Sequence, residues 1–167
     1  MKIFLGLARL IDVLNRKLGE SVSWLTLVLV IVICIDVIMR YLFSSTKTWV
    51  LELEWHLFSI IFLIGAAYTL LSDKHVRVDL FYEQFKPSRK RLVDTIGVLI
   101  FLIPWSCVII YYGFEYALNS FSFKEGSPQP NGLPARYLIK SFISIGFFLL
   151  LLQGISIVIH SLFDSEE

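Results

Sequence analysis

The side chains that could do chemistry in this chain lie where long apolar runs end or begin. Asp36 and Arg40 stand four residues apart near the end of one run, and Glu52, Glu54 and His56 stand at the start of the next. Residues four apart share a helix face, so Asp36 and Arg40 can form an ion pair. If these runs cross a bilayer, an isolated charge at its centre costs roughly 2.5–3.5 kcal/mol. The charged groups therefore need partners among lipid headgroups, other helices or another protein.

Glu52, Trp55 and His56 share one helical face, and Glu54 points away from it. We predict a polar cluster that sets helix packing or contacts a partner protein, made of Asp36, Arg40, Glu52, Glu54, Trp55 and His56. An internal ion pair reaching the headgroups and simple interfacial anchoring of the carboxylates are the alternatives. The sequence argues against a proton or substrate pathway, because no second carboxylate lies deeper and the group is too shallow for a midplane site.

The composition is that of an integral membrane protein. Of 167 residues, 56% are hydrophobic and 17% are charged, whereas a soluble domain is near half apolar and a quarter charged. Cys34 and Cys107 both lie in apolar runs, which indicates buried thiols rather than a disulfide framework. The sequence has no metal-ligand spacing and no phosphate loop, and nothing in it indicates a nucleic-acid partner. We therefore expect no cofactor, no metal site and no enzyme activity.

The apolar runs predict four transmembrane helices, at about residues 22–43, 49–71, 92–118 and 137–163. At 1.5 Å per residue, a run of 22 residues reaches roughly 33 Å, enough for a hydrocarbon core of about 30 Å. Pro104 predicts a kink in the third helix because it lacks a backbone N–H. Gly146 and Gly154 permit close helix approach in the fourth, where Gln153 should find a hydrogen-bond partner inside the bundle.

Two further helices are predicted to lie in the membrane interface. Residues 1–20 have an apolar face and a polar face that includes Asp12. No cleavage site follows them, which indicates an interfacial helix rather than a signal peptide. Val78, Phe81, Tyr82 and Phe85 share a face of a shorter interfacial helix between the second and third spans. The predicted fold is thus an all-α membrane protein, with residues 1–167 forming a single membrane domain. The proline- and glycine-rich stretch GSPQPNGLP between the third and fourth spans is a loop.

The distribution of basic residues predicts the topology. Ten of the fifteen fall on one side: Lys2, Arg9, Arg16, Lys17, Lys74, Arg77, Lys86, Arg89, Lys90 and Arg91. By the positive-inside rule, both termini are cytoplasmic and the GSPQPNGLP loop is external. Lys86, Arg89, Lys90 and Arg91 form a candidate contact for anionic phospholipid, as a topology signal that attracts such lipid or as a dedicated lipid site shared with a partner.

The physics alone therefore favours an accessory or scaffold subunit over an autonomous transporter, since there is no midplane ionisable pair and no inverted repeat. Because histidines can ligate haem, the main alternative function is a haem-bearing or structural membrane anchor of a redox enzyme. Two axial histidines must face each other at similar depth, yet His56 and His160 are expected at opposite surfaces and His75 lies past the end of its span. A small autonomous exporter is a second alternative.

Several stretches over residues 20–160 resemble the DctQ-like small membrane subunit of tripartite ATP-independent periplasmic (TRAP) transporters. They are Arg40-Tyr41, Trp49 with Glu52 and Glu54, Gly65-Ala66-Ala67, His75-Val76-Arg77-Val78-Asp79, Gly132-Leu133-Pro134-Ala135-Arg136-Tyr137 with Lys140, and Leu151-Leu152-Gln153-Gly154. The order and spacing of these stretches, together with the topology, carry the resemblance.

The resemblance implies a multi-pass protein of the bacterial inner membrane. In this family, a large membrane subunit carries the substrate and sodium sites and moves substrate by an elevator-type motion, and a periplasmic binding protein delivers an organic anion, typically a carboxylate. The small subunit would bind neither substrate nor sodium; it would stabilise and extend the scaffold and help dock the binding protein. Because the chain ends at Glu167, we expect the large subunit to be a separate polypeptide.

Overall fold

The computed structural model describes residues 2–72, 82 and 85–163. Its elements are α1 (Lys2–Phe43), α2 (Thr48–Leu71), α4 (Pro87–Gly97), the π-helical segment η1 (Val98–Leu102), α5 (Ile103–Ser122) and α6 (Arg136–Phe163). Within these ranges four helices are long and apolar enough to cross a membrane: Lys2–Phe43, Thr48–Leu71, Ser88–Ser122 and Arg136–Phe163. No strand occurs in the described ranges. The predicted all-α fold with four membrane-spanning helices is confirmed.

Helix α1 runs without a break through the boundary predicted between the interfacial helix at residues 1–20 and the first span at 22–43. Its inward face carries small and polar residues, among them Ala8, Asn15 and Gly19, which are buried. The apolar face points outward, with Ile3 85% and Leu10 66% exposed. The predicted position of residues 1–20 in the membrane interface stays a prediction, and the second interfacial helix falls mainly outside the described residues.

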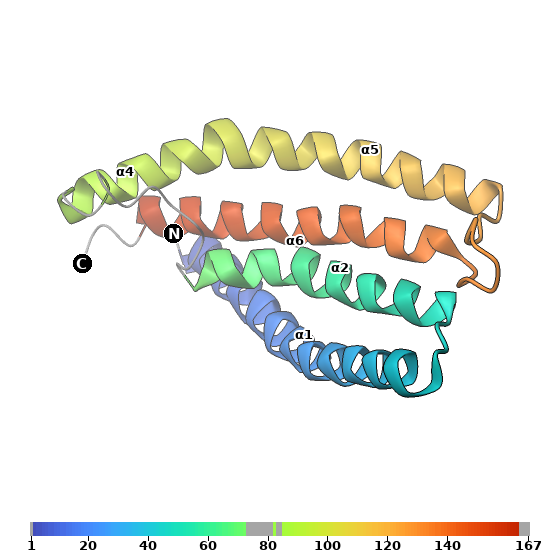
Figure 1. Ribbon diagram of the computed structural model, residues 1–167. Helices are drawn as coiled ribbons and strands as arrows, with labels where there is room; N and C mark the ends of the chain where they lie inside the picture. The colour runs from blue at the N-terminus through green and yellow to red at the C-terminus, as the bar shows by residue number, and fades with distance from the viewer. Residues whose placement is uncertain (1, 73–81, 83–84, 164–167) are drawn as a thin grey trace.

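Helices α4, η1 and α5 form one long rod that arches near its middle (Figure 1). The π-helical turn Val98–Leu102 ends two residues before Pro104. Proline has no N–H to donate and its ring crowds the carbonyl four residues earlier, so the local helix winds more loosely. The irregularity predicted at Pro104 is therefore present, as a π-turn on its N-terminal side.

Helix α6 lies between α5 and α2 and also packs against α1 (Figure 1). Glycines bring its backbone close to its neighbours. A Cβ atom on Gly146 would lie 2.8 Å from the Leu63 carbonyl oxygen, and one on Gly154 would lie 2.7 Å from a methyl carbon of Leu102. The predicted close approach at both glycines is confirmed. A small apolar core joins α1, α2 and α6, made of Val22, Ile64, Ala67 and Leu149.

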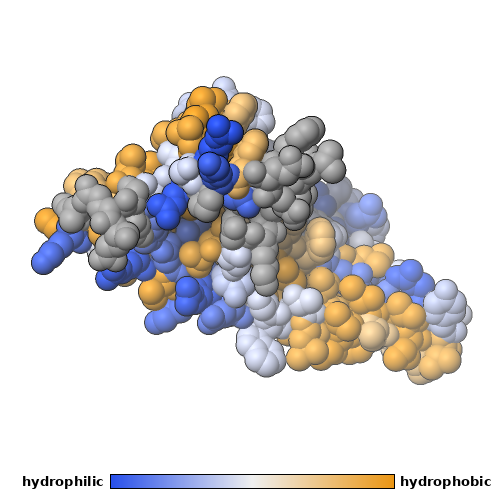
Figure 2. Space-filling model, turned by 90° about the vertical axis from the view of Figure 1, so that its left-hand side faces the viewer, coloured by the Kyte–Doolittle hydropathy of each residue, from blue (hydrophilic) through white to orange (hydrophobic). Residues whose placement is uncertain are grey.

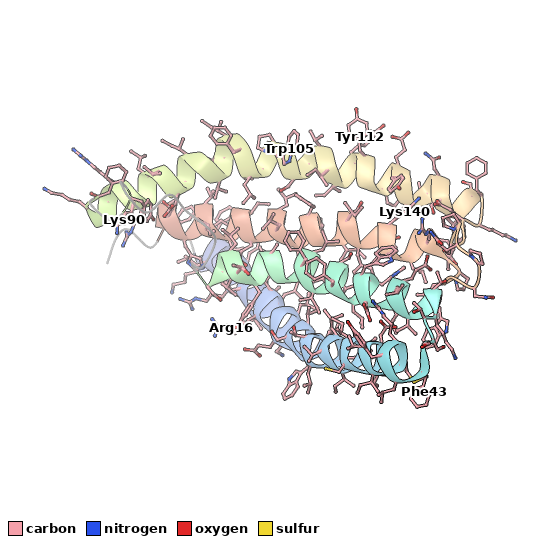
Figure 3. The ribbon with its side chains drawn as sticks, viewed as in Figure 1. Arg16, Phe43, Lys90, Trp105, Tyr112 and Lys140 are labelled. Carbon is pink, nitrogen blue, oxygen red and sulfur yellow. The ribbon has the colours of Figure 1, made fainter. Side chains whose placement is uncertain are left out.

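Most large apolar side chains point away from the bundle. Cys34 and Cys107 are exposed on the same apolar helices, so the prediction that both thiols are buried is wrong. On the α4–α5 rod, Trp105 and Tyr112 (labelled in Figure 3) are 64% and 63% exposed. In a membrane-spanning bundle this surface meets lipid or a partner. Lipid tails are as apolar as these side chains, so burying them inside the bundle gives no hydrophobic gain. The described interior is instead rich in small and polar residues, and these position the sites below.

Candidate functional site

Glu52 is the centre of a polar site at the end of the bundle that carries the loop between α5 and α6. It lies in the second turn of α2 and is 5% exposed. Its carboxylate accepts hydrogen bonds from the Ser127 hydroxyl and from the Leu133 N–H, the latter at 2.6 Å. The Arg136 guanidinium lies 3.6 Å from one of the same oxygens. One side chain thus joins α2 to the loop and to the first residue of α6.

The proline-rich loop closes around this carboxylate. The Ser127 N–H donates to the Leu133 carbonyl at 3.1 Å, and the Gly132 N–H donates to the Gln129 carbonyl at 3.2 Å. A Cβ on Gly132 would lie 2.7 Å from a Glu52 oxygen and closer still to Ser127. Only glycine therefore leaves room for the carboxylate to enter the turn. The loop is a fixed structure and not a free linker.

A second contact fixes the loop to α6. Lys140 donates a hydrogen bond to the Glu125 carboxylate, and its ammonium lies 3.9 Å from the ring centre of Tyr116 on α5. The Arg136 N–H donates to the Glu125 carbonyl at 2.9 Å. The hydrogen bond from Lys140 holds the pKa of the Glu125 carboxyl below its ordinary value.

Trp55 and His56 complete the Glu52 group. The two rings lie 3.9 Å apart, and the Arg136 guanidinium lies 5.8 Å from the Trp55 ring, within cation–π range. The His56 Nδ1 lies 2.5 Å from the backbone carbonyl oxygen of Glu52, so this nitrogen carries the proton and donates it. Arg136 is therefore placed by both the carboxylate and the aromatic ring.

The remaining residues of the predicted polar cluster are Asp36 and Arg40 on α1 and Glu54 on α2. Asp36, 4% exposed, pairs with Arg40 one turn later, and the Arg40 side chain is 47% exposed. Glu54 interacts electrostatically with both. One Glu54 oxygen is buried without a hydrogen-bond partner among the described residues. The structure thus divides the six residues into a Glu52–Trp55–His56 group on the α6 side of α2 and a second group in which Asp36 and Arg40 of α1 interact with Glu54 of α2.

A second polar network lies at the opposite end of the bundle, between α1 and α6. One oxygen of Asp12 accepts hydrogen bonds from the Gln153 amide at 3.0 Å and the Ser156 hydroxyl at 2.7 Å. Its other oxygen lies 3.0 Å from the His160 Nε2. The Asn15 amide donates to Gln153 at 2.8 Å. The prediction that Gln153 finds a partner inside the bundle is confirmed.

Sequence reasoning missed this network as a site. It placed Asp12 on the water-facing side of an interfacial helix. A signal was present, since Asp12 and Asn15 are three apart on α1, and Gln153, Ser156 and His160 follow at spacings of three and four on α6. Each set forms one stripe on its helix. Two polar stripes on membrane helices are best satisfied by each other.

The histidines do not form an axial pair. His56 lies near the start of α2 and His160 near the end of α6, at opposite ends of the bundle, and each ring has a partner within the chain. His75 lies outside the described residues.

The basic cluster stands at the start of α4, at the end of the molecule where Lys90 is labelled in Figure 3. Lys86, Arg89 and Arg91 are exposed and Lys90 is half-buried. Seen from this end, hydrophilic side chains gather among apolar ones (Figure 2).

Residues 29–164 match the model of a protein family described as "Tripartite ATP-independent periplasmic transporters, DctQ component". Comparison with curated proteins gives no match. The family is a transporter component and not an enzyme family, and it works with a large membrane subunit and a periplasmic binding protein. Together with the four apolar helices, the match indicates a multi-pass protein of the bacterial inner membrane. The chain belongs to the DctQ family of small TRAP transporter membrane subunits.

Proposed function

We propose that this small subunit is a fixed part of the scaffold of a sodium-coupled TRAP transporter for an organic anion, typically a carboxylate. It stabilises and extends the large elevator-type subunit, which is a separate chain, and its external loop helps dock the periplasmic binding protein. The observation that carries the proposal is the use of Glu52 and Asp12 as ties between helices.

Both carboxylates have all their oxygens engaged within the chain. Glu52 holds Ser127, Leu133 and Arg136, and Asp12 holds Gln153, Ser156 and His160. A group that binds and releases a substrate or an ion must exchange ligands during each cycle. Groups already engaged with neighbouring helices instead resist relative motion of those helices. This arrangement suits a subunit that stays still while its partner moves.

The external loop supports the docking role. Glu52 holds its backbone at Leu133, and Lys140 holds its Glu125 side chain. Lys124, Gln129 and Asn131 are exposed on it. With both termini cytoplasmic, as the basic residues predict, this loop faces the periplasm. A surface that is ordered before binding loses little entropy when a partner docks.

Reconstitution tests the scaffold role. Proteoliposomes containing the large subunit, this chain and the binding protein should take up the anion when a sodium gradient is imposed. Omission of this chain should abolish uptake, and this chain alone should give none. Sodium-driven uptake by this chain alone would overturn the proposal, as would full uptake without it.

Charge reversal tests the docking role. Lys124→Glu alters the external loop, and Lys17→Glu makes the same change at the opposite end of the bundle, where it serves as the control. Rim charges mainly affect the rate of association. Lys124→Glu should therefore raise the binding-protein concentration needed for half-maximal uptake, with the maximal rate retained. If the two variants behave alike, the loop is not part of the docking surface.

A further inference from the structure

An apolar groove of about 1070 Å³ lies between α2, α6 and the α4–α5 rod. Asp94 and Gly97 line one end of it, and Val108 and Phe147 line the other. The fourteen-residue step from Asp94 to Val108 corresponds to about 21 Å of helix. Half of a hydrocarbon core is about 15 Å. The groove is therefore long enough to cross one leaflet.

The basic cluster stands at the end of the groove near Asp94. Lys86, Arg89 and Arg91 are exposed there, beside the half-buried Lys90. Lys90 is held over the ring of Tyr82, which lines the groove, at 5.0 Å. The Tyr82 hydroxyl donates to Asp94 at 2.6 Å, so the acidic group at this end is engaged within the chain. Among the described residues at this end, the four basic side chains outnumber Asp94, so this part of the groove carries a positive charge.

The far part of the groove is formed by apolar and aromatic side chains, including Phe101, Leu102, Trp105 and Leu150. Trp105 lies about midway along the rod and Lys90 near its start (Figure 3). The site is thus positive at the membrane surface and apolar for the depth of one leaflet. This is the charge and polarity profile of an anionic phospholipid.

We propose that the groove holds one acyl chain of an anionic phospholipid whose phosphate group binds the basic cluster. The charged end attracts the headgroup, and the length and apolar walls accept the chain. By the predicted topology this is the cytoplasmic leaflet, which carries the anionic lipid. The site belongs to this chain, so it does not depend on the transport activity of the complex.

Gly97 offers a clean way to block the groove. It lines the groove, and a Cβ built on it meets no atom within 4 Å. Gly97→Leu should therefore occupy the groove without displacing a neighbour, and leucine is the better helix former. Gly6→Leu is the matched control, because a Cβ on this residue of α1 also meets nothing within 4 Å.

Lipid retention is the first measurement. The wild-type protein and each variant are purified from native membranes in mild detergent with whatever large subunit accompanies them, and bound phospholipids are quantified by mass spectrometry. Loss of two buried CH₂ groups already corresponds to about a tenfold loss of affinity. Gly97→Leu should therefore retain at least roughly tenfold less anionic phospholipid than wild type or Gly6→Leu. Arg89→Gln with Arg91→Gln should show a similar loss, and Arg16→Gln with Lys17→Gln should not.

Other outcomes overturn the proposal. If Arg89→Gln with Arg91→Gln lowers the retained anionic phospholipid but Gly97→Leu does not, the basic residues attract lipid headgroups without a defined site in the groove. Equal retention of neutral and anionic phospholipid would remove the role of the cluster. Loss of the large subunit from Gly97→Leu with lipid unchanged would assign the groove to a partner helix.

A second readout holds even if Gly97→Leu purifies poorly. In vesicles of phosphatidylcholine with brominated phosphatidylglycerol, the wild-type protein should lose more tryptophan fluorescence than in vesicles with the bromine on phosphatidylcholine. The difference should disappear in Trp105→Phe. An unchanged difference in that variant would place the lipid elsewhere.

Discussion

Replacing Gln153 by leucine tests the polar tie between α1 and α6. The side chain is 2% exposed, accepts a hydrogen bond from Asn15 at 2.8 Å and donates one to Asp12 at 3.0 Å. Leucine has a similar size but can make neither bond. The variant therefore leaves the buried Asn15 and the partly buried Asp12 each short of a bond and changes the packing little.

The magnitude follows from the two bonds. In proteins generally, a bond to a charged group contributes about 1.5–3 kcal/mol and a neutral one about 0.5–1.5 kcal/mol. Between membrane helices the measured values are smaller, about 0.6 kcal/mol on average and at most about 1.7. Asp12 keeps Ser156 and His160 as partners, so the loss should be about 2 kcal/mol. For a chain of this size, that lowers the melting temperature by about 4–8 °C.

Thermal unfolding in mild detergent, followed by circular dichroism, measures the effect. Gln129→Leu is the control, since it makes the same change at an exposed loop position and should stay within about 0.5 kcal/mol of wild type. The double variant with Asn15→Leu should lose less than the two single variants together, because they share one bond. A Gln153→Leu protein that melts with wild type would show that apolar contacts alone hold α1 to α6.

Two further predictions concern packing and pH. Gly146→Ala should destabilise the protein by about 1–3 kcal/mol, because its Cβ would lie 2.8 Å from the Leu63 backbone. Gly65→Ala, whose Cβ meets nothing within 4 Å, should instead stabilise it by up to about 1 kcal/mol. Equal melting temperatures for the two variants would contradict this account of the packing. The folded-state pKa of Glu125 is lowered by Lys140, so its contribution to stability is fully present above its ordinary pKa of about 4.3 and is lost as pH falls through the folded value. Melting temperatures recorded against pH should therefore fall more steeply on acidification for wild type than for Glu125→Gln, and parallel curves would refute the assignment.

The four spans could be predicted because their signal is local. Apolar runs of sufficient length have no stable alternative to a helix in lipid, and the prolines and glycines of GSPQPNGLP exclude the loop from any helix. The pairing of Asp36 with Arg40 was equally local, since a spacing of four places both on one face. Pro104 indicated a disturbance in the third span, although the π-turn form of it needed the structure.

The orientation of α1 could not be read from its own pattern. Residues 1–20 show an apolar and a polar face, and a helix lying on a membrane has the same two faces. In the structure, Asn15 is buried against α6 while Ile3 and Leu10 point outward. The choice depends on the polar stripe of α6, more than 130 residues away in the sequence.

The partners of Glu52 were beyond sequence reasoning for a different reason. A buried carboxylate near a membrane surface demands donors, and that much was predicted. The donors are Ser127 and Leu133, which lie in an irregular loop with no periodicity to place them. Gly132 is a small residue in a turn-rich stretch, and only the structure shows that its missing side chain makes room for the carboxylate.

Helix α6 is held at both ends, and this links the fold to the proposed role. Arg136 at its start faces Glu52 of α2, and His160 near its end faces Asp12 of α1. In Figure 1 these ends lie on opposite sides of the bundle. Polar contacts are directional, so each end resists rotation of α6 about its axis as well as sliding. Burial of apolar surface adds little to these ties, because lipid tails are as apolar as the helix surface. The two ties therefore give the bundle a fixed shape against which a moving partner could work.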